Sequence, residues 1–427
     1  MRFSDEWASI LPHQAIVLPE GFLWGVASSA FQAEGGEVPN DWVAAAREGK
    51  VPANPGNGFW SRAEEDFALV AELGFRHYRL SIEWSRVEPE EGRFDQQALD
   101  RYVAICDAAT IAGLTPWVNF LHFTLPLWVA KTGRLRNPTN RGHFWRYLER
   151  VARALAGHAR HFHTQNESMV NVLSSYMLGE TLPYERDPQV TYEMARHVLA
   201  LHARGYQLLH EIVPDATVAT IEVYIPLIPS DAKYEAPASF FESWYHGTLL
   251  RALRTGVVEL PGREPEEIAG LRGAVDLYGF NYYCASSLGP EGVGSYAAHD
   301  PAPIDSMGRK VCPEEMERGL RRVAEALPGV PILVTENGCP TEDEAFRIRY
   351  IAAHLAAVMR ACAAGVDVRG YFHWTAVDNY EWQHGFGPAR FGLIGFDAVS
   401  LQRHVKASGR WFAEMIRRGV LDPAEIP

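Results

Sequence analysis

The stretch SRAEEDFALVAELGFRHYRLSI (61–82) contains one expected helix followed directly by one expected strand. Ser61 and Glu64 have the spacing of a capping box, which satisfies free N–H groups at a helix start, and Gly74 is a typical helix stop. The β-branched and aromatic run from His77 to Ile82 predicts a strand. The apolar residues at helical spacing on one face of the expected helix are Phe67, Val70 and Leu73.

The same alternation of strand and helix recurs along the whole chain. Eight strands alternating with helices over 427 residues predict an α/β protein, a (β/α)8 TIM barrel, in preference to an open doubly wound sheet. A Rossmann-like sheet is the alternative, and it is weakened because no GxGxxG or GxxxxGK[ST] motif follows any expected strand. The expected strands are 23–28, 77–82, 115–121, 161–166, 217–223, 275–282, 331–335 and 368–372.

The composition indicates a folded globular protein. Hydrophobic residues make up 47% and charged residues 22%, which excludes a disordered chain. The net charge of −13 provides no field that would attract phosphate backbones or anionic lipid. No apolar run has the length of a membrane span, and the first residues lack a basic segment followed by an apolar one. We therefore expect no nucleic-acid partner, no membrane contact and a cytoplasmic location.

Domain organisation and cysteine usage are also simple. No linker or repeat divides the sequence, so we expect a single catalytic barrel domain over residues 1–427, with residues 1–20 and 418–427 as terminal extensions. The five cysteines are scattered and form no metal-binding pattern. We expect neither a cofactor nor a metal, and the sequence leaves a homo-oligomer open.

Polar side chains gather where the expected strands end. Glu167 follows the fourth strand within HTQNES, Glu336 follows the seventh within ILVTENG, and Arg79 lies in the second. Active sites of such barrels form at these strand ends. Two carboxyl groups that flank an acetal can cleave it without a metal, and aromatic rings suit the apolar faces of a sugar. The pattern favours glycoside hydrolysis, but spacing alone does not show which glutamates form a pair.

Three histidines, His158, His161 and His163, allow a metal site as an alternative, because alternate residues of a strand share one face. No carboxylate at a known ligand spacing accompanies them. We expect them to serve in packing and at the surface.

Several motifs together resemble glycoside hydrolase family 1. The resemblance extends from Phe22 to Asp397 and the region of Trp411, so it covers nearly the whole chain. It implies a (β/α)8 enzyme that hydrolyses β-glycosides with retention of configuration. The motifs are FLWGVASSAFQAEGG (22–36), RLSIEWSR (79–86), NE (166–167), LYGFNYY (277–283), TENG (335–338), FHWTAVDNYEW (372–382) and FGLIGFD (391–397).

Carried over by position, the resemblance implies a role for each catalytic residue. Glu167 is expected to be the general acid/base, and Glu336 the nucleophile that forms a covalent glycosyl-enzyme. Arg79 is expected to keep Glu336 ionised, because an adjacent cation lowers the pKa of a carboxyl group. Tyr283 is expected to orient the nucleophile, with Asn281 supporting the site beside it. The structural alternative for Arg79 is a plain buried ion pair.

The resemblance also implies a closed-ended pocket for the terminal sugar. Asn166 is expected to contact the sugar 2-hydroxyl, where hydrogen bonds strengthen in the transition state. A carboxylate at Glu381 welcomes hydroxyl groups and disfavours a 6-phosphosugar. The residues expected to bind the remaining hydroxyls and the sugar face are Gln32, His122, Trp374, Glu381 and Trp382.

The chain departs from the usual family pattern at Ser168, where proline is typical, and at Phe123, where tryptophan is typical. Proline stiffens the backbone, so a serine at position 168 leaves the placement of the adjacent Glu167 less constrained. We expect a retaining β-glycosidase whose small-molecule substrate is a β-glycoside, with β-D-glucose as the terminal sugar. The alternatives are a transglycosylase and a non-catalytic sugar-binding protein on the same barrel.

Overall fold

A closed barrel of eight parallel strands forms the centre of the computed structural model, which describes residues 5–295 and 303–427. The barrel confirms the predicted (β/α)8 architecture, and the Rossmann-like alternative is wrong because the first and last barrel strands, β2 and β14, pair with each other. The strands, in their order around the barrel, are β10 (Leu277–Asn281), β13 (Ile332–Asn337), β14 (Val368–Trp374), β2 (Leu23–Ala27), β3 (His77–Ser81), β4 (Thr115–Asn119), β5 (His161–His163) and β6 (Thr217–Val223).

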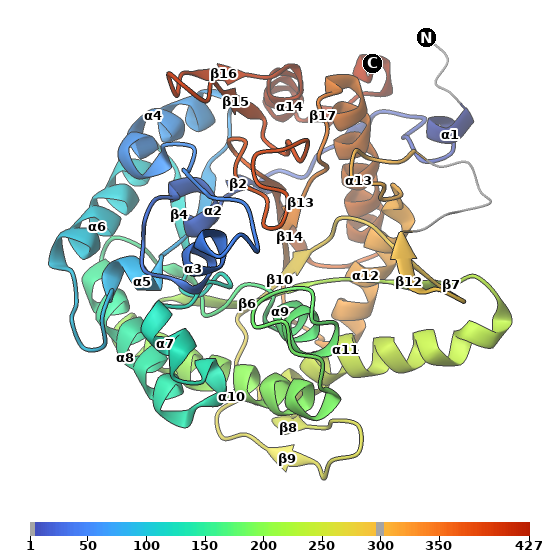
Figure 1. Cartoon of the computed structure of the whole chain (residues 1–427). Coiled ribbons are helices and arrows are strands. Elements are labelled where there is room, and N and C mark those ends of the chain that lie inside the picture. The colour runs from blue at the N-terminus through green and yellow to red at the C-terminus, as the bar shows by residue number, and fades with distance from the viewer. Residues whose placement is uncertain (1–4, 296–302) are drawn as a thin grey trace.

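Helices surround the barrel and connect its strands (Figure 1). The long helices are α4 (Phe59–Glu72), α6 (Gln96–Ile111), α8 (Pro138–Leu155), α10 (Pro188–Ile212), α11 (Glu235–Thr255), α12 (Pro313–Ala326), α13 (Glu344–Ala363) and α14 (Ala407–Arg418). The short ones are α1 (Asp5–Ala8), α2 (Ala30–Glu34), α3 (Asp41–Arg47), α5 (Trp84–Val87), α7 (Leu127–Lys131) and α9 (Ser168–Val172), which continues into a π-helical turn at Leu173–Met177.

The helix α4 begins two residues before the expected capping box. Gly58 has a left-handed backbone with φ of 89°, and the Asn57 side chain accepts a hydrogen bond from the N–H of Phe59 at 3.1 Å. Ser61 therefore lies inside the helix, and Glu64 pairs with Arg101 instead of capping. The predicted capping box is wrong because the left-handed turn at Gly58 starts the helix before Ser61.

Two layers of apolar side chains hold the barrel together. The larger layer lies between the strands and the surrounding helices, where Phe67 and Val70 of α4 and Leu73, which directly follows it, are buried as predicted. The smaller layer fills the barrel interior below the strand ends. There Gly25 of β2 permits close packing, because a Cβ atom at this position would lie 2.4 Å from the ring of Phe372. The interior layer consists of Trp117, Ala219, Leu277, Leu333 and Phe372.

Within the described residues, four small sheets lie outside the barrel. The first joins segments near the two ends of the chain, β1 (Ile16–Val17) and β17 (Val420–Leu421). The others are β7 (Leu227–Pro229) with β11 (Ser286–Gly289) and β12 (Gly292–Ser295), β8 (Val257–Val258) with β9 (Glu266–Glu267), and β15 (Ile394–Phe396) with β16 (Arg403–Val405). None of the helices in the described part of the chain combines the length and apolar character needed to cross a bilayer.

Candidate active site

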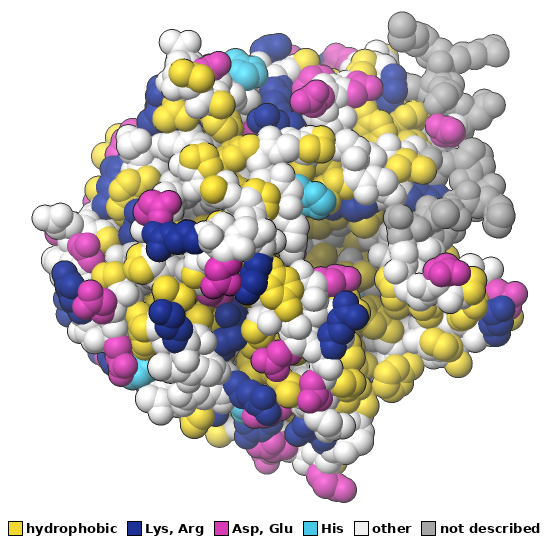
Figure 2. All heavy atoms as spheres, in the orientation of Figure 1, with side chains coloured by type: hydrophobic (Ala, Val, Ile, Leu, Met, Phe, Trp, Pro, Cys, Tyr) yellow, Lys and Arg dark blue, Asp and Glu magenta, His cyan; other side chains and the backbone are white. Residues whose placement is uncertain are grey.

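A pocket opens at the carboxyl ends of the barrel strands, and the space-filling view shows this face hollowed near its centre (Figure 2). The pocket brings together residues that are hundreds of positions apart in the chain, because the ends of parallel strands meet on one side of a barrel. Its lining includes Gln32, Trp42, His122, Phe123, Asn166, Glu167, Ser174, Thr181, Tyr283, Arg309, Glu336, Trp374, Glu381, Trp382 and Gln383.

Glu336 lies within β13 and faces both a cation and a phenol. Its Oε1 accepts a hydrogen bond from Nη1 of the fully buried Arg79, and its Oε2 accepts one from the Tyr283 hydroxyl at 2.6 Å. The other terminal nitrogen of Arg79 donates to Oδ1 of Asn166. A charge-assisted pair of this kind is stronger than a hydrogen bond between neutral groups, so one guanidinium anchors both Glu336 and Asn166.

Glu167 has a different environment, although it lines the same pocket. Its Oε1 accepts a hydrogen bond from the Asn281 amide at 2.6 Å, and the hydroxyl of Thr335 donates to the Asn281 Oδ1 at 2.6 Å, which fixes the amide orientation. Burial and the nearby charge of Glu336 raise the pKa of Glu167 well above its usual value. Asn281 therefore bonds to Glu167, whereas Tyr283 bonds to Glu336.

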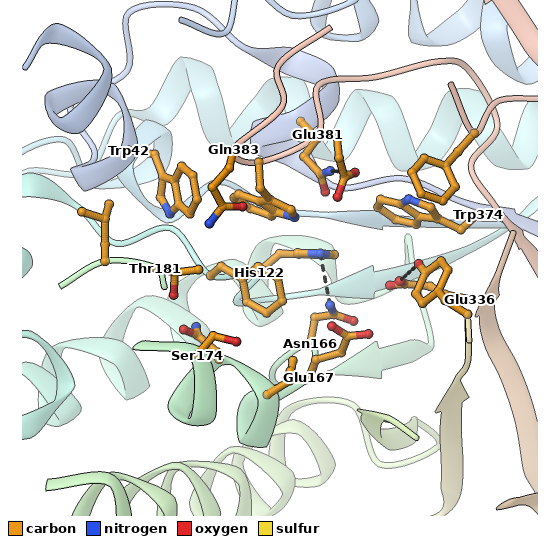
Figure 3. A pocket seen from close by; sticks show the side chains of 18 of the residues that line it. Trp42, His122, Asn166, Glu167, Ser174, Thr181, Glu336, Trp374, Glu381 and Gln383 are labelled. Atoms are coloured by element: carbon orange, nitrogen blue, oxygen red, sulfur yellow. Dashed lines mark hydrogen bonds between the residues drawn. The ribbon is translucent and has the colours of Figure 1, made fainter. Parts of the chain in front are cut away.

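The TENG sequence ends in a glycine for a steric reason. A Cβ atom on Gly338 would lie 2.0 Å from the carbonyl oxygen of Trp374, at the end of the adjacent strand β14. Only glycine lets the ends of β13 and β14 approach this closely. This close approach sets Glu336 and Trp374 at the same end of the pocket, as Figure 3 shows.

Gln32 and Glu381 are neighbours in the lining of the pocket. The Gln32 amide nitrogen donates to the carbonyl of Tyr380 at 2.7 Å and to Oε2 of Glu381 at 3.4 Å, while Ser29 donates to the Gln32 Oε1 at 2.7 Å. Burial raises the pKa of Glu381 to about 7, although the charge of Arg309 opposes the rise. The side chains of Gln32 and Glu381 are thus oriented before any ligand binds.

His122 lies between the carboxylates and the indole rings. Its Nε2 is 3.1 Å from the Asn166 amide and its Nδ1 is 3.1 Å from the Ser81 hydroxyl. Its ring is nearly parallel to the rings of Trp374 and Trp382, with centroid distances of 6.0 and 6.2 Å. The chain of contacts from Arg79 through Asn166 to His122 links the polar and aromatic walls of the site.

The pocket extends further than the closed-ended shape expected from the sequence. Figure 3 shows Trp42, Thr181 and Gln383 at the end opposite Trp374 and Glu336. The Trp42 and Trp382 rings pack with a centroid distance of 4.6 Å. This end provides a second aromatic and polar compartment beyond His122.

The three histidines considered as metal ligands serve other purposes. His158 pairs with Asp107, and His161 stacks on Trp117 with a centroid distance of 4.1 Å. His163 lies buried in the barrel interior, where burial lowers its pKa well below the usual value. Across residues 5–295 and 303–427, no three His, Cys, Asp or Glu side chains are grouped so that they could hold a metal ion.

Several residues at or near the site were not singled out from the sequence, among them Trp42, Arg309, Glu222, Ser174, Thr181 and Gln383. Trp42 carries no sequence signal of a pocket position. Arg309 lies over the rings of Tyr283 and Phe391, with centroid distances of 5.6 and 5.5 Å. Glu222 is the last residue but one of β6, and its carboxyl oxygens bond to the N–H groups that follow Glu167, so the rule that singled out polar residues at strand ends would have found it.

The comparisons with known proteins agree with this geometry. The model of glycosyl hydrolase family 1 matches residues 14–420. The chain belongs to glycosyl hydrolase family 1. This family 1 enzyme is 28% identical to β-glucosidase A of Thermotoga maritima over 444 aligned residues, which cover 95% of this chain and 98% of that protein.

Two further relatives of this glycoside hydrolase extend the comparison. It is 28% identical to a bifunctional β-D-glucosidase/β-D-fucosidase of Bifidobacterium breve, over 94% of this chain and 98% of that protein. The solved β-glycosidase from Pyrococcus horikoshii superposes with a TM-score of 0.88 at 32% identity, covering 96% of this chain and 97% of that one. The expected family is confirmed, and a non-catalytic binding protein is not supported.

Proposed function

We propose that this family 1 enzyme is a retaining β-glycosidase that releases terminal β-D-glucosyl residues from small β-glycosides. The relatives named as β-glucosidases support the glucosyl preference. The relative named for both glucoside and fucoside hydrolysis makes β-D-fucosides the next substrates to test.

One observation carries the assignment of roles: the two pocket carboxyl groups have opposite partners. Glu336 accepts hydrogen bonds from a guanidinium and a phenol, so a cation lies directly against its carboxyl oxygens. Burial and the nearby charge of Glu336 raise the pKa of Glu167 well above its usual value, and its side chain accepts a hydrogen bond from the neutral amide of Asn281, so Glu167 suits the role of proton donor. Glu336 is the nucleophile and Glu167 the acid/base under this proposal, which divides the two roles as double displacement requires.

The proposed reaction has two steps. In the first, a carboxylate oxygen of Glu336 forms a bond to C1 while the bond from C1 to the glycosidic oxygen breaks, and the proton of Glu167 moves to the departing oxygen. In the second, a water molecule gives a proton to Glu167 and forms a bond to C1, which releases Glu336. Asn166 lines the pocket, where a hydrogen bond to the sugar can strengthen as charge develops at C1, and Arg79 holds the Asn166 side chain from behind.

A chemical-rescue experiment with Glu336→Gly tests the proposal. The substrate is 2,4-dinitrophenyl β-D-glucoside, whose leaving group needs no protonation. The variant should lose turnover, and added azide should restore release of dinitrophenol with an α-glucosyl azide as the product, because azide attacks C1 from the vacated face. A variant that keeps normal turnover without azide would refute the nucleophile role.

The matched control is Glu83→Gln. Glu83 is also a buried carboxyl that accepts hydrogen bonds from neutral groups, including the Thr124 hydroxyl at 2.8 Å, but it does not line the pocket. Its variant should hydrolyse the substrate with retention and should gain nothing from azide. Formation of an α-azide by this control would show that the rescue is unspecific.

A further inference from the structure

The backbone at Glu167 is unusual and needs support from its surroundings. Its φ of 43° and ψ of 52° place a non-glycine residue in the left-handed region, directly before the five-residue helix α9. Ser168 follows where the family resemblance leads one to expect proline, so the ring that would stiffen this turn is missing. Some other contact must hold the turn.

Glu222 at the carboxyl end of β6 provides that contact. Its Oε2 accepts a hydrogen bond from the backbone N–H of Met169 at 2.8 Å, and its Oε1 accepts one from the N–H of Val170 at 3.2 Å. The Tyr245 hydroxyl of α11 donates to the same Oε1 at 2.9 Å. These bonds join the first turn of α9 to the barrel wall immediately after Glu167.

All the donors that reach Glu222 are neutral. Glu222 is 1% exposed, and its carboxyl oxygens accept hydrogen bonds from the N–H groups of Met169 and Val170 and from the Tyr245 hydroxyl. A fourth donor is the N–H of Val223 at 3.3 Å. Donors that are backbone N–H groups cannot accept a proton in return, so the arrangement suits a carboxylate.

We propose that Glu222 is a positioning residue that holds the Glu167 turn and places a negative charge behind it, a role that rests on the proposed acid/base function of Glu167. The turn is held through the N–H groups of Met169 and Val170, in place of the missing proline. The charge acts through space on Glu167, because like charges disfavour ionisation.

The electrostatic part follows from the groups that face Glu222. These are Glu167 on the turn, Tyr245 on α11 and Tyr278 on β10. Burial raises the pKa of Glu222 to about 7, and its charge contributes to the raised pKa of Glu167. As pH rises through about 7, Glu222 ionises and makes it harder for Glu167 to lose its own proton.

The test compares two substrates that differ in their need for an acid. We would measure kcat/KM of wild type and Glu222→Gln with 2,4-dinitrophenyl β-D-glucoside and with cellobiose. We expect a loss of about tenfold or more on cellobiose and less than about threefold on the dinitrophenyl substrate, because general-acid catalysis contributes about 10²- to 10⁴-fold only where the leaving group is poor. The alkaline limb of the cellobiose pH profile should also move to lower pH.

A second substitution separates the two parts of the role. Adding Ser168→Pro to Glu222→Gln should recover most of the lost cellobiose activity, because the proline ring again restricts the turn. The alkaline limb of the pH profile should stay at its lower pH, because the negative charge of Glu222 is still absent. Glu83→Gln serves as the matched control with a buried carboxyl group. It should lower kcat/KM equally for both substrates or not at all.

Several results would overturn the proposal. An equal loss on both substrates, or an unchanged alkaline limb together with unchanged selectivity, would reduce Glu222 to a packing residue. If Glu222→Gln fails to fold, Tyr245→Phe removes one donor and should give a smaller loss selective for cellobiose; no selectivity there refutes the role. Wild type inactive on both substrates would instead refute the proposed function itself.

Discussion

Arg79 and Glu336 form an ion pair in which the arginine side chain is 0% exposed and the glutamate side chain 4% exposed. Arg79 also donates to Asn166, so one guanidinium holds both the proposed nucleophile and the residue proposed to bind the sugar 2-hydroxyl. A second ion pair with equally little exposure joins Arg403 and Asp66, neither of which lines the pocket. The two pairs allow stability and catalysis to be separated.

We expect Arg79→Gln to lower the free energy of unfolding by about 3–5 kcal/mol, because it leaves a buried carboxylate without its cation. Hydrolysis of 2,4-dinitrophenyl β-D-glucoside should be lost as well. Urea denaturation and kcat/KM measure the two effects. Arg403→Gln is the control: it should cost similar stability through Asp66 while the folded enzyme keeps its activity. Equal inactivation of both folded variants would contradict the special role of Arg79.

Glu167→Ala should reveal the acid/base role through the leaving group. With 2,4-dinitrophenyl β-D-glucoside kcat/KM should change little, whereas with an alkyl glucoside it should fall about 10²- to 10⁴-fold, because only the alkoxide needs a proton from the enzyme. Azide should yield a β-glucosyl azide, since it attacks the glycosyl-enzyme from the face that Glu167 vacated. A uniform loss on both substrates would exclude this role.

Glu381→Gln should make the protein more stable at neutral and alkaline pH. The folded state holds the Glu381 proton up to about pH 7, while the unfolded chain releases it near 4.5. Folding therefore loses stability as pH rises between these values, and the glutamine variant avoids a loss of about 3 kcal/mol. Urea unfolding at pH 4 and pH 8 measures the difference, which should be near zero at the lower pH because Glu381 is then largely protonated in both states. A constant difference would show that Glu381 does not titrate in this range.

Discrimination against 6-phosphoglucosides should increase with pH. Above about pH 7 the ionised Glu381 repels a phosphate on the sugar, so the kcat/KM ratio of the nitrophenyl glucoside to its 6-phosphate should rise about tenfold between pH 6 and pH 8. Glu381→Gln should flatten this rise to the part that the phosphate's own ionisation causes. An unchanged profile in the variant would place the sugar 6-position away from Glu381.

The barrel could be predicted from the sequence. Strand and helix alternate visibly, and all eight expected strands form, with ends shifted by a few residues. The ends of the strands were harder to predict, because the pattern of residues does not show where the pairing between strands stops. For example, β5 ends at His163, three residues earlier than expected, since the chain turns toward the pocket before Glu167.

The site, like the fold, could be predicted from the sequence only in part. Periodicity and motifs name Glu167 and Glu336 because short segments carry those signals. The partners of each residue depend on contacts between distant strands: Asn281 bonds to Glu167, Tyr283 bonds to Glu336, and Glu222 reaches the N–H groups behind Glu167. No local pattern encodes such pairings.

By itself the sequence determined the (β/α)8 class, the family and the set of polar residues at the strand ends, because these follow from local periodicity and from contiguous motifs. Only the tertiary structure decided which carboxyl group meets a cation, which one is buried beside neutral groups, and how far the pocket extends toward Trp42. The reason is physical: protonation states and pocket shape depend on the three-dimensional surroundings of a side chain, and barrel closure brings those surroundings together from distant parts of the chain.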